Sequence, residues 1–344
     1  MSNPRQFIPV ASAQAPYFVG VDLGGTGIKA GVVDDLGRPM SWDTVPTETE
    51  RGPENAAQRM GKLVLEVIRQ AGLTPADVSR VGLGSPGTMD VPAGMLLEPP
   101  NLPGWENFPI RDRVSHHCGL PVTFANDANA AAYGEFWVGR GREYRSMVLL
   151  TLGTGVGGGI IVGEELIEGH SSHGAECGHI IIDCRDDARV CSCGQPGHLE
   201  AYCSAIAVTK RAQEALDSGR KSSVTARLEH GEELTPLLLA KEAESGDAFS
   251  VEVIMETARY LGIGIVSLMH TIDPEGVVLG GAMTFGRGET DLGRRFLGRV
   301  VEEVHRRAFP VPARRTKIGY ASLGADAGYI GAAGVARLAH RRNK

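Results

Sequence analysis

An apolar strand, a glycine turn and a second apolar strand occur twice in this chain, and this recurrence restricts the folds open to it. The first copy covers residues 17–34 and reads YFVGVD, LGGTG and IKAGVVD. The second begins with SMVLLTL at residues 146–152 and continues through a glycine-rich turn into GIIVGEELIEG. Such a repeat indicates an internal duplication, and 344 residues are enough for two packed lobes.

The expected division of the chain follows from these two copies. We predict a disordered tail over residues 1–16, a smaller α/β lobe over residues 17–140 and a larger α/β lobe over residues 141–344. The hinge is expected near GRGREYR at residues 139–145. The last helix is expected either to complete the second lobe or to pack back on the first.

Composition excludes several classes of protein. The chain is 42% apolar and 22% charged with a net charge of -6, which gives no basic surface for nucleic acid. The first 16 residues lack the continuous apolar core of a signal peptide, and no later segment reaches membrane-spanning length. We therefore expect a cytoplasmic protein with neither a nucleic-acid nor a membrane partner.

The first glycine turn, DLGGTGIK at residues 22–29, is suited to phosphate. Gly24, Gly25 and Gly27 let the backbone approach phosphate oxygens, and Thr26 supplies a hydroxyl. Asp22 at the end of the strand is placed to hold Mg²⁺, directly or through water. The turn differs from a Walker loop in its spacing and in leading into a strand. A tight hairpin that needs glycine for positive φ is an equally good explanation of the turn alone.

The second glycine turn opens the segment 152–179, LGTGVGGGIIVGEELIEGHSSHGAECGH. Gly153, Thr154 and Gly155 can present backbone N–H groups to an anion. The segment ends on Glu176 and His179, which are three residues apart. A phosphate site next to a carboxylate and an imidazole indicates a phosphotransferase acting on a polar small molecule.

Asp127 follows a predicted strand and precedes an alanine-rich helix in LPVTFANDANAAAYGEF, residues 120–136. Capping of the helix is the commonest use of an aspartate at such a place. The other possible role is that of a catalytic base, a carboxylate that accepts the proton of an attacking hydroxyl. Local sequence favours capping, and only the surrounding motifs favour the catalytic role.

Further pocket candidates lie where strands end, the usual place for ligands in open α/β sheets. Gly84 belongs to the GSPG turn after one strand, and Gly280 and Gly281 follow the buried strand VVL. The bare backbone at Gly280 and Gly281 suits a flat ring such as adenine. Asn101 in NLPGW is a candidate for contact with a sugar hydroxyl. A plain loop at residue 84 and a turn or capping role for Asn101 are about equally good alternatives.

The cysteines indicate a metal site. Five of the six cysteines lie between residues 177 and 203, within or near CSCGQPGHLE at residues 191–200. Cys191, Cys193 and His198, together with His179, form a sulfur and nitrogen set of the type that zinc prefers. Four protein ligands leave no open position for water, so the predicted zinc is structural and holds a loop from which Glu176 and Glu200 face the pocket. Buried structural thiols are the alternative.

Taken together, these motifs resemble those of the ROK family (repressors, open reading frames and sugar kinases). The segment 152–179 resembles the family signature, DLGGTGIK its first phosphate motif, NDANAAAYGE its catalytic segment and CSCGQPGHLE its zinc motif. The resemblance extends from Phe18 to about Leu338, nearly the whole chain. His198 stands where most members have a third cysteine, and zinc accepts imidazole there.

The resemblance implies an actin-like fold, a duplicated ribonuclease H-like α/β unit in two lobes with the active site in the cleft between them. It implies Asp127 as general base. It implies that Asn101, Asn126, Glu176, His179 and Glu200 contact the sugar, and Gly84 and Asp127 complete the predicted sugar-binding set. It implies that Gly25, Thr26, Gly153, Thr154 and Gly155 hold the phosphates and that Gly280 and Gly281 line the adenosine pocket. Asp22, Gly24 and Lys29 complete the predicted nucleotide-binding set. The implied cofactors are ATP, Mg²⁺ and structural Zn²⁺, and the implied assembly is a homodimer.

The expected activity is ATP-dependent phosphorylation of glucose to glucose 6-phosphate. Kinases for N-acetylglucosamine or N-acetylmannosamine are the nearest alternatives, and polyphosphate is an alternative donor. A sugar-responsive repressor is the alternative from another class, but only about 16 residues precede the first strand, too few for a helix-turn-helix module. A sugar sensor without activity would not need both Asp22 and Asp127.

Overall fold

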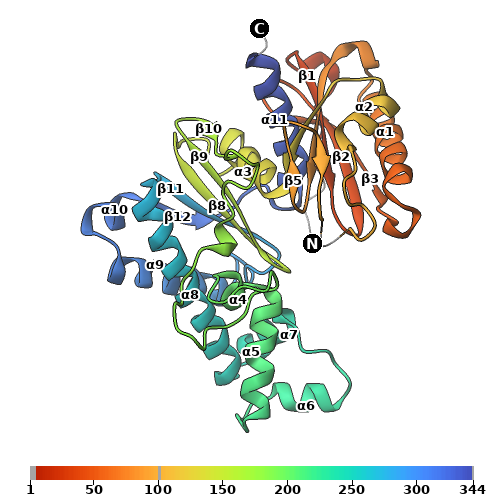
Figure 1. The fold of residues 1–344 in the computed structure, drawn as a ribbon. Coiled ribbons are helices and arrows are strands. Elements are labelled where there is room, and N and C mark those ends of the chain that lie inside the picture. The colour runs from red at the N-terminus through yellow and green to blue at the C-terminus, as the bar shows by residue number, and fades with distance from the viewer. Residues whose placement is uncertain (1–4, 100–101, 343–344) are drawn as a thin grey trace.

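Two five-stranded sheets with the same strand order form the framework of the computed structural model, which describes residues 5–99 and 102–342 (Figure 1). The first sheet has the order β3-β2-β1-β4-β7. Its strands are β1 (Tyr17–Leu23), β2 (Gly27–Val33), β3 (Pro39–Pro46), β4 (Val78–Ser85) and β7 (Val122–Asn126). The second has the order β10-β9-β8-β11-β12. Its strands are β8 (Met147–Leu152), β9 (Val156–Val162), β10 (Glu165–Leu166), β11 (Gly276–Gly281) and β12 (Lys317–Tyr320).

Strand directions are also the same in the two sheets. In each, three consecutive strands form an antiparallel meander, and two further strands are added in parallel beside the first strand of the meander. The predicted internal duplication and the two-lobed α/β fold are therefore confirmed. Since ligands gather at the carboxyl ends of parallel strands, the register is informative there. It places Asp22 beside Gly84, and Ser85 beside Asn126.

Amphipathic helices cover the outer face of the first sheet. Along α1 (Pro53–Gln70) the buried side chains include Met60, Val64 and Val67, which recur at the helical spacing expected for one apolar face. The second outer helix is α2 (Ile110–Cys118), which ends at Gly119 in the left-handed conformation. A short hairpin of β5 (Met89–Asp90) and β6 (Met95–Leu96) extends from this lobe.

Two helices pack between the sheets. The helix α3 (Asp127–Trp137) follows the first sheet in sequence but packs on β8 and β9 of the second, whereas α11 (Ala327–Arg342) follows the second sheet and packs on β1 and β4 of the first. They touch each other closely, because a Cβ atom at Gly331 would lie 1.7 Å from the carbonyl oxygen of Ala130. By these contacts we assign α11 to the first lobe.

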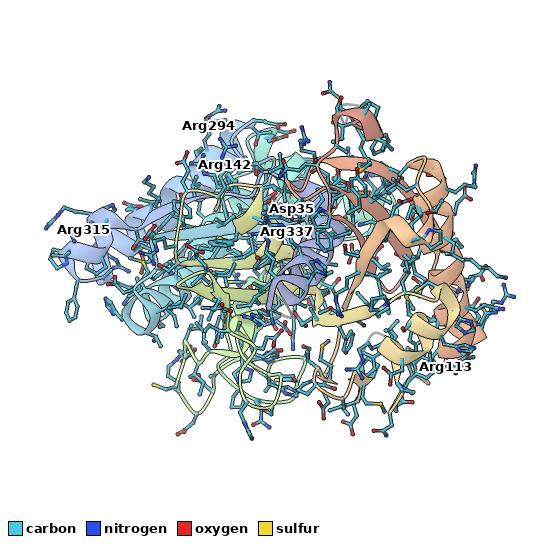
Figure 2. The ribbon with its side chains drawn as sticks, turned by 90° about the horizontal axis from the view of Figure 1, so that it is seen from above. Asp35, Arg113, Arg142, Arg294, Arg315 and Arg337 are labelled. Atoms are coloured by element: carbon cyan, nitrogen blue, oxygen red, sulfur yellow. The ribbon has the colours of Figure 1, made fainter. Side chains whose placement is uncertain are left out.

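An ion pair also ties α11 to the first lobe. The Arg337 guanidinium lies 2.7 Å from the buried carboxylate of Asp35, and both residues lie near the centre of the view in Figure 2. Arg337 also covers the ring of Trp137 at 5.0 Å. The C-terminal helix is thus held by charge and by aromatic contact as well as by its apolar face.

Helices cover the outer face of the second sheet and extend away from it (Figure 1). The longest, α8 (Ala248–Ile272), packs with α9 (Asp291–Arg307) and contributes many residues to the largest buried cluster. The others are α4 (Glu200–Cys203), α5 (Ala205–Asp217), α6 (Val224–Glu229), α7 (Pro236–Glu244) and α10 (Pro310–Arg315). Single 3₁₀ turns occur at η1 (Val10–Ser12), η2 (Thr49–Arg51), η3 (Pro75–Asp77), η4 (Cys177–His179) and η5 (Gly324–Asp326). None of the described helices combines the length and the hydropathy needed to cross a membrane.

The N-terminal segment corrects one prediction. Residues 5–16 are ordered against the first lobe, because Ile8 and Ala13 pack on its apolar core and backbone groups are hydrogen-bonded to it. The Ile8 N–H donates to the Pro39 carbonyl at 2.9 Å, and the Gln14 N–H donates to Asp34 at 3.1 Å. The expectation of a disordered tail is therefore wrong over this range.

Candidate active site

A cavity of about 710 Å³ lies between the two lobes and is lined by both. It brings together residues that are far apart in sequence. Those singled out from the sequence that line it are Asp22, Lys29, Asn126, Asp127, Gly153, Thr154, Gly155, Glu176, His179, Glu200, Gly280 and Gly281. The second glycine turn, the residues that flank the first one and the strand ends at Asn126 and Gly281 therefore meet at one site.

Asn126, and not Asp127, caps α3. The Asn126 side-chain oxygen accepts hydrogen bonds from the N–H groups of Ala128 at 2.9 Å and Asn129 at 3.1 Å. This satisfies the unpaired N–H groups at the start of the helix. The capping role that local sequence favoured for Asp127 is thus filled by its neighbour. The Asp127 carboxylate accepts the Ala128 N–H at 2.8 Å, and Asp127 lines the cavity.

The environment of Asp127 raises the pKa of its carboxyl from 3.8 to about 6. Burial is the main cause, and the negative charges of Asp22 and Glu176 act in the same direction. The Ala128 N–H opposes them by stabilising the charged form. A carboxylate with a raised pKa is a stronger base than one in water, which suits proton abstraction near neutral pH.

Asp22 and Lys29 form the first-lobe wall of the cavity. They are cross-strand neighbours on β1 and β2, and the Lys29 ammonium lies 3.6 Å from the Asp22 carboxylate. Burial raises the pKa of Asp22, and the charge of Lys29 opposes that effect. One carboxylate beside a cavity fits the usual mode of Mg²⁺, which is held by one or two carboxylates together with substrate phosphates and water.

The β8–β9 turn and the end of β11 form the second-lobe wall. Gly153, Thr154 and Gly155 lie in the turn of a hairpin, where the Gly153 N–H donates to the Gly155 carbonyl at 3.0 Å. Gly281 has φ +89°, and a Cβ atom there would lie 2.2 Å from the Leu152 carbonyl oxygen. Only glycine fits at this position, because the chain approaches β8 closely.

Several predicted residues lie elsewhere. Gly24, Gly25 and Thr26 do not line the cavity; their turn folds onto the first lobe, where the Thr47 hydroxyl donates to the Gly24 carbonyl at 2.6 Å. Gly84 packs behind the site, since a Cβ atom there would lie 3.4 Å from Ala130 and 3.7 Å from the Asp127 Cα. Asn101 lies outside the described residues.

Glu200 connects the cavity to the cysteine-rich loop. One carboxylate oxygen accepts the Val156 N–H at 2.9 Å. The other accepts the Ser192 hydroxyl and the Cys191 thiol, the latter at 3.4 Å. The Glu200 side chain is therefore fixed between the glycine turn and the loop at residues 191–198.

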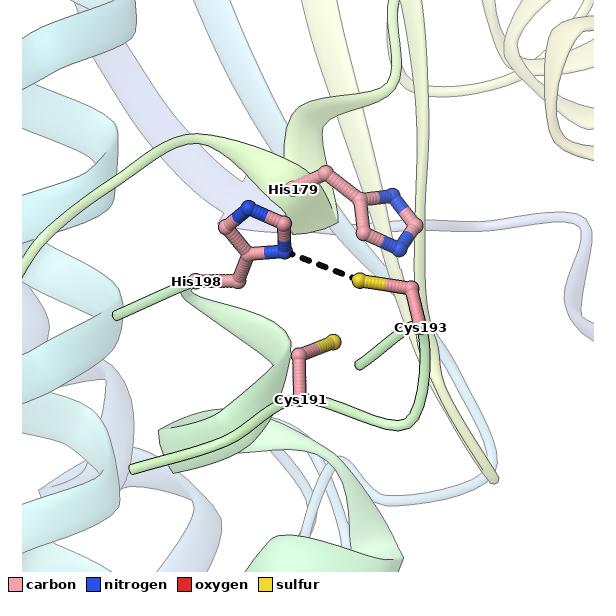
Figure 3. Close-up of side chains that lie close together, drawn as sticks. All are labelled: His179, Cys191, Cys193 and His198. Atoms are coloured by element: carbon pink, nitrogen blue, oxygen red, sulfur yellow. Dashed lines mark hydrogen bonds between the residues drawn. The ribbon is translucent and has the colours of Figure 1, made fainter. Parts of the chain in front are cut away.

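His179, Cys191, Cys193 and His198 form a compact cluster (Figure 3). One ligand atom from each lies within 4.8 Å of the others, and Cys193 Sγ is 3.2 Å from His198 Nδ1. Ligand atoms around a tetrahedral zinc are separated by about 3.3–3.8 Å, given Zn–N and Zn–S distances of about 2.0–2.3 Å. The cluster thus fits a structural zinc site after a small contraction. His179 also lies 3.4 Å from Glu176, whose carboxylate raises the pKa of the imidazole.

Sequence reasoning missed Arg287, which also lines the cavity. Its guanidinium has no acidic partner among the described residues; it donates to the Ala321 carbonyl at 3.5 Å. Its backbone is left-handed, with φ 55°, which is unusual for a residue other than glycine and is found at functional sites. No spacing rule singles out an arginine in an irregular loop.

Comparison with known proteins gives the family. The model of the ROK family matches residues 18–339. The chain belongs to the ROK family. A glucokinase from Halalkalibacterium halodurans is 32% identical over 315 residues, which are 92% of this chain and 93% of that protein. A ROK family glucokinase from Streptomyces griseus, solved in complex with glucose and AMPPNP, is 34% identical with a TM-score of 0.76 and covers 94% of this chain and 100% of that one.

The relatives of this chain include transcriptional repressors as well as kinases. A xylose repressor from Caldicellulosiruptor bescii is 30% identical over 305 residues, which are 89% of this chain and 74% of the repressor. Membership of the family alone therefore does not decide between a kinase and a repressor, and function has to be argued from the site.

Proposed function

We propose that this protein is an ATP-dependent hexose kinase that transfers the γ-phosphoryl group to the 6-hydroxyl of glucose. The observation that carries the proposal is the state of Asp127. Its carboxyl has a raised pKa and lies at the interlobe cavity, and it is not needed to cap α3 because Asn126 does so. The similarity to glucokinases over nearly the whole chain supports the choice of reaction and sugar.

Asp127 acts as the general base. Its carboxylate accepts the proton of the sugar hydroxyl as that oxygen attacks the γ-phosphorus. The bond from the sugar oxygen to phosphorus forms while the bond from the γ-phosphorus to the bridging oxygen of ADP breaks. Asn126 orients the base by capping α3, and its amide nitrogen stays available to the sugar.

The phosphates of ATP bind opposite Asp127. The backbone N–H groups of Thr154 and Gly155 in the β8–β9 turn face the phosphates, and the cations Lys29 and Arg287 offset the phosphate charge. Asp22 would hold Mg²⁺, which when bound would offset the charge of the phosphates. Gly280 and Gly281 leave room for the adenosine.

Gly24, Gly25 and Thr26 reach the phosphates only if the lobes close further, since they lie outside the cavity in the present arrangement.

Glu176, His179 and Glu200 bind the sugar from the second lobe. We infer that zinc holds His179, Cys191, Cys193 and His198 and has a structural role. Its ligands fix the loop that carries Ser192, and Ser192 in turn holds Glu200 at the edge of the cavity. Gly84 gives α3 close contact with β4 and thus places Asp127. The proposed contact of Asn101 with the sugar rests on family resemblance alone.

The alternatives differ in their substrates or in activity. An N-acetylglucosamine or N-acetylmannosamine kinase would use the same base with a wider pocket at the sugar's 2-position. A sugar-responsive regulator without kinase activity is favoured by one observation, the similarity to a xylose repressor. Such a protein would bind sugar but would not need Asp22 or a base at Asp127.

A coupled assay of ADP release tests the proposal. The purified protein is incubated with ATP and Mg²⁺ and with glucose, mannose, fructose, N-acetylglucosamine or N-acetylmannosamine in turn. We expect strong turnover on glucose. Turnover on an N-acetyl sugar alone would reassign the substrate, and sugar binding by calorimetry without turnover on any sugar would favour the regulator. Polyphosphate replaces ATP in a parallel series to identify the donor.

A further inference from the structure

A second acidic side chain of α3, Glu135, is buried without a cation. It is 0% exposed, and none of the ion pairs among the described residues involves it. Its carboxylate accepts hydrogen bonds from the Arg140 N–H at 2.8 Å, the Leu323 N–H at 2.7 Å, and the N–H and hydroxyl of Ser322 at 2.9 and 3.1 Å. A buried charge with this many donors is well satisfied, because charge-assisted hydrogen bonds are stronger than neutral ones.

The loop that Glu135 holds belongs to the proposed nucleotide side of the cavity. It runs from the end of β12 to the start of α11, and Ala321 and Gly324 in it line the cavity. Arg287 donates to the Ala321 carbonyl on the other side of this loop. A little further along the chain, Gly328 packs on the Asp22 carboxylate, where a Cβ atom would lie 2.5 Å away. Gly328 belongs to α11, so the loop shapes the cavity and leads directly into the helix that packs on Asp22.

The same helix carries the proposed base. Asp127 begins α3, and Glu135 is eight residues further along, about 12 Å at the rise of an α-helix. A helix of two to three turns packed on the second sheet and on α11 is rigid over that length. Through Glu135, the base and the loop at residues 321–324 are fixed to one another.

We propose that Glu135 is a positioning residue that holds this loop in the shape required for the nucleotide and fixes its position relative to Asp127. The proposal rests on the proposed function. The geometry requires a carboxylate at this position, since both oxygens accept and all four partners donate. Glutamine would place an NH₂ group against N–H donors on one side, and aspartate is shorter by one methylene.

Glu303 offers a matched control. It is also a buried glutamate, 0% exposed, but it lies on α9 and pairs with Arg299, Arg306 and Arg307 outside the cavity. Glu303→Gln weakens a buried carboxylate network of similar size without touching the loop. It therefore reports what loss of stability alone does to the kinetics.

The test compares Glu135→Gln, Glu135→Asp and Glu303→Gln in the full chain. We expect Glu135→Gln to raise the KM for ATP about tenfold, the effect of one lost charge-assisted hydrogen bond, while the KM for sugar changes less than about twofold. Glu135→Asp should recover part of the affinity for ATP. Glu303→Gln should leave both KM values near those of the parent. Equal changes of all parameters in Glu135→Gln and Glu303→Gln would overturn the proposal.

A second measurement does not depend on turnover. Hydrogen exchange followed by mass spectrometry reports the N–H groups of Ser322 and Leu323, which Glu135 protects. We expect faster exchange in peptides covering residues 321–326 in Glu135→Gln, and no change there in Glu303→Gln. Unchanged exchange in Glu135→Gln would overturn the positioning role. If the parent protein has no kinase activity but Glu135→Gln still exchanges faster at these residues, the result would support the positioning of the loop and would refute only the proposed function.

Discussion

Asn126 and Asp127 are adjacent in sequence but divide two tasks between them. The Asn126 side chain closes the first turn of α3 by accepting the N–H groups of residues 128 and 129, and the Asp127 carboxylate is left facing the interlobe cavity. A helix that begins with two residues able to cap can use one for structure and the other for chemistry. The predictions below begin from this division.

The acid limb of the pH profile should report Asp127. A base acts in its deprotonated form, and the pKa of Asp127 is raised from 3.8 to about 6. The carboxylate is therefore present above pH 6 and is lost as the pH falls through 6. We expect kcat/KM to fall about tenfold per pH unit below that point. Since the charge of Asp22 contributes to the raised pKa, Asp22→Asn should move the limb to lower pH even as it reduces activity. A limb near pH 4 in the parent protein would contradict this account.

The same raised pKa predicts that Asp127→Asn stabilises the fold. An acid whose folded pKa lies above its unfolded value destabilises the native state when it is ionised. The penalty is fully present above pH 6 and disappears as the pH falls through the unfolded value of 3.8. The linkage gives an upper value of about 3 kcal/mol, which partial exposure to solvent reduces. In denaturant unfolding, the free energy of unfolding of Asp127→Asn should exceed that of the parent at pH 8 but not at pH 4. A lower free energy of unfolding for the variant at pH 8 would be evidence against the burial effect.

Arg287 should matter for the nucleotide and not for the sugar. It is a cavity cation without an acidic partner among the described residues, so its charge is available to phosphate. We expect Arg287→Ala to raise the KM for ATP about tenfold, with a smaller effect for Arg287→Lys. Arg69→Ala is the control, because Arg69 lies on α1, pairs with Glu66 and does not line the cavity. Similar KM values for ATP in the parent and in Arg287→Ala would show that Arg287 does not contribute to the binding of ATP.

Metal analysis should detect zinc at about one equivalent per chain, and Cys193→Ala should reduce it to a small fraction. Cys184→Ser is the matched control, since Cys184 is an exposed cysteine outside the cluster and should leave the zinc content unchanged. Loss of zinc should lower the Tm and raise the KM for sugar, because the loop that holds Glu200 is released. A parent protein purified without metal, with normal activity, would refute the site.

The sequence predicts the meanders and the main site residues because each has a local signal. Glycine turns mark the hairpins at residues 17–34 and 146–162, helical spacing marks α1, and the strand ends place Asp22, Asp127 and the β8–β9 turn at one edge. The cysteine and histidine spacing identifies the four members of the cluster at residues 179–198.

Long-range contacts account for what the sequence does not predict. Ordering of residues 5–16 depends on the surface that Ile8 and Ala13 find on the first lobe. In the sequence, Glu135 is one more polar residue of an alanine-rich helix. Its role appears only in the structure, where the N–H groups of residues 322 and 323 donate to it. Arg287 lies in an irregular loop with its backbone at positive φ, and only the folded chain places this loop at the cavity. Such contacts are set by tertiary packing, to which local pattern is insensitive.

Steady-state turnover of glucose and ATP by the parent protein and by Asp127→Ala tests the central claim most directly. Binding of glucose and of a non-hydrolysable ATP analogue is measured by calorimetry on the same two preparations. The account predicts that the variant binds both ligands within a few-fold of the parent and loses about 10²–10⁴ in kcat, the usual contribution of a general base. A variant that keeps the parent's kcat would contradict the account and would remove Asp127 from the chemistry.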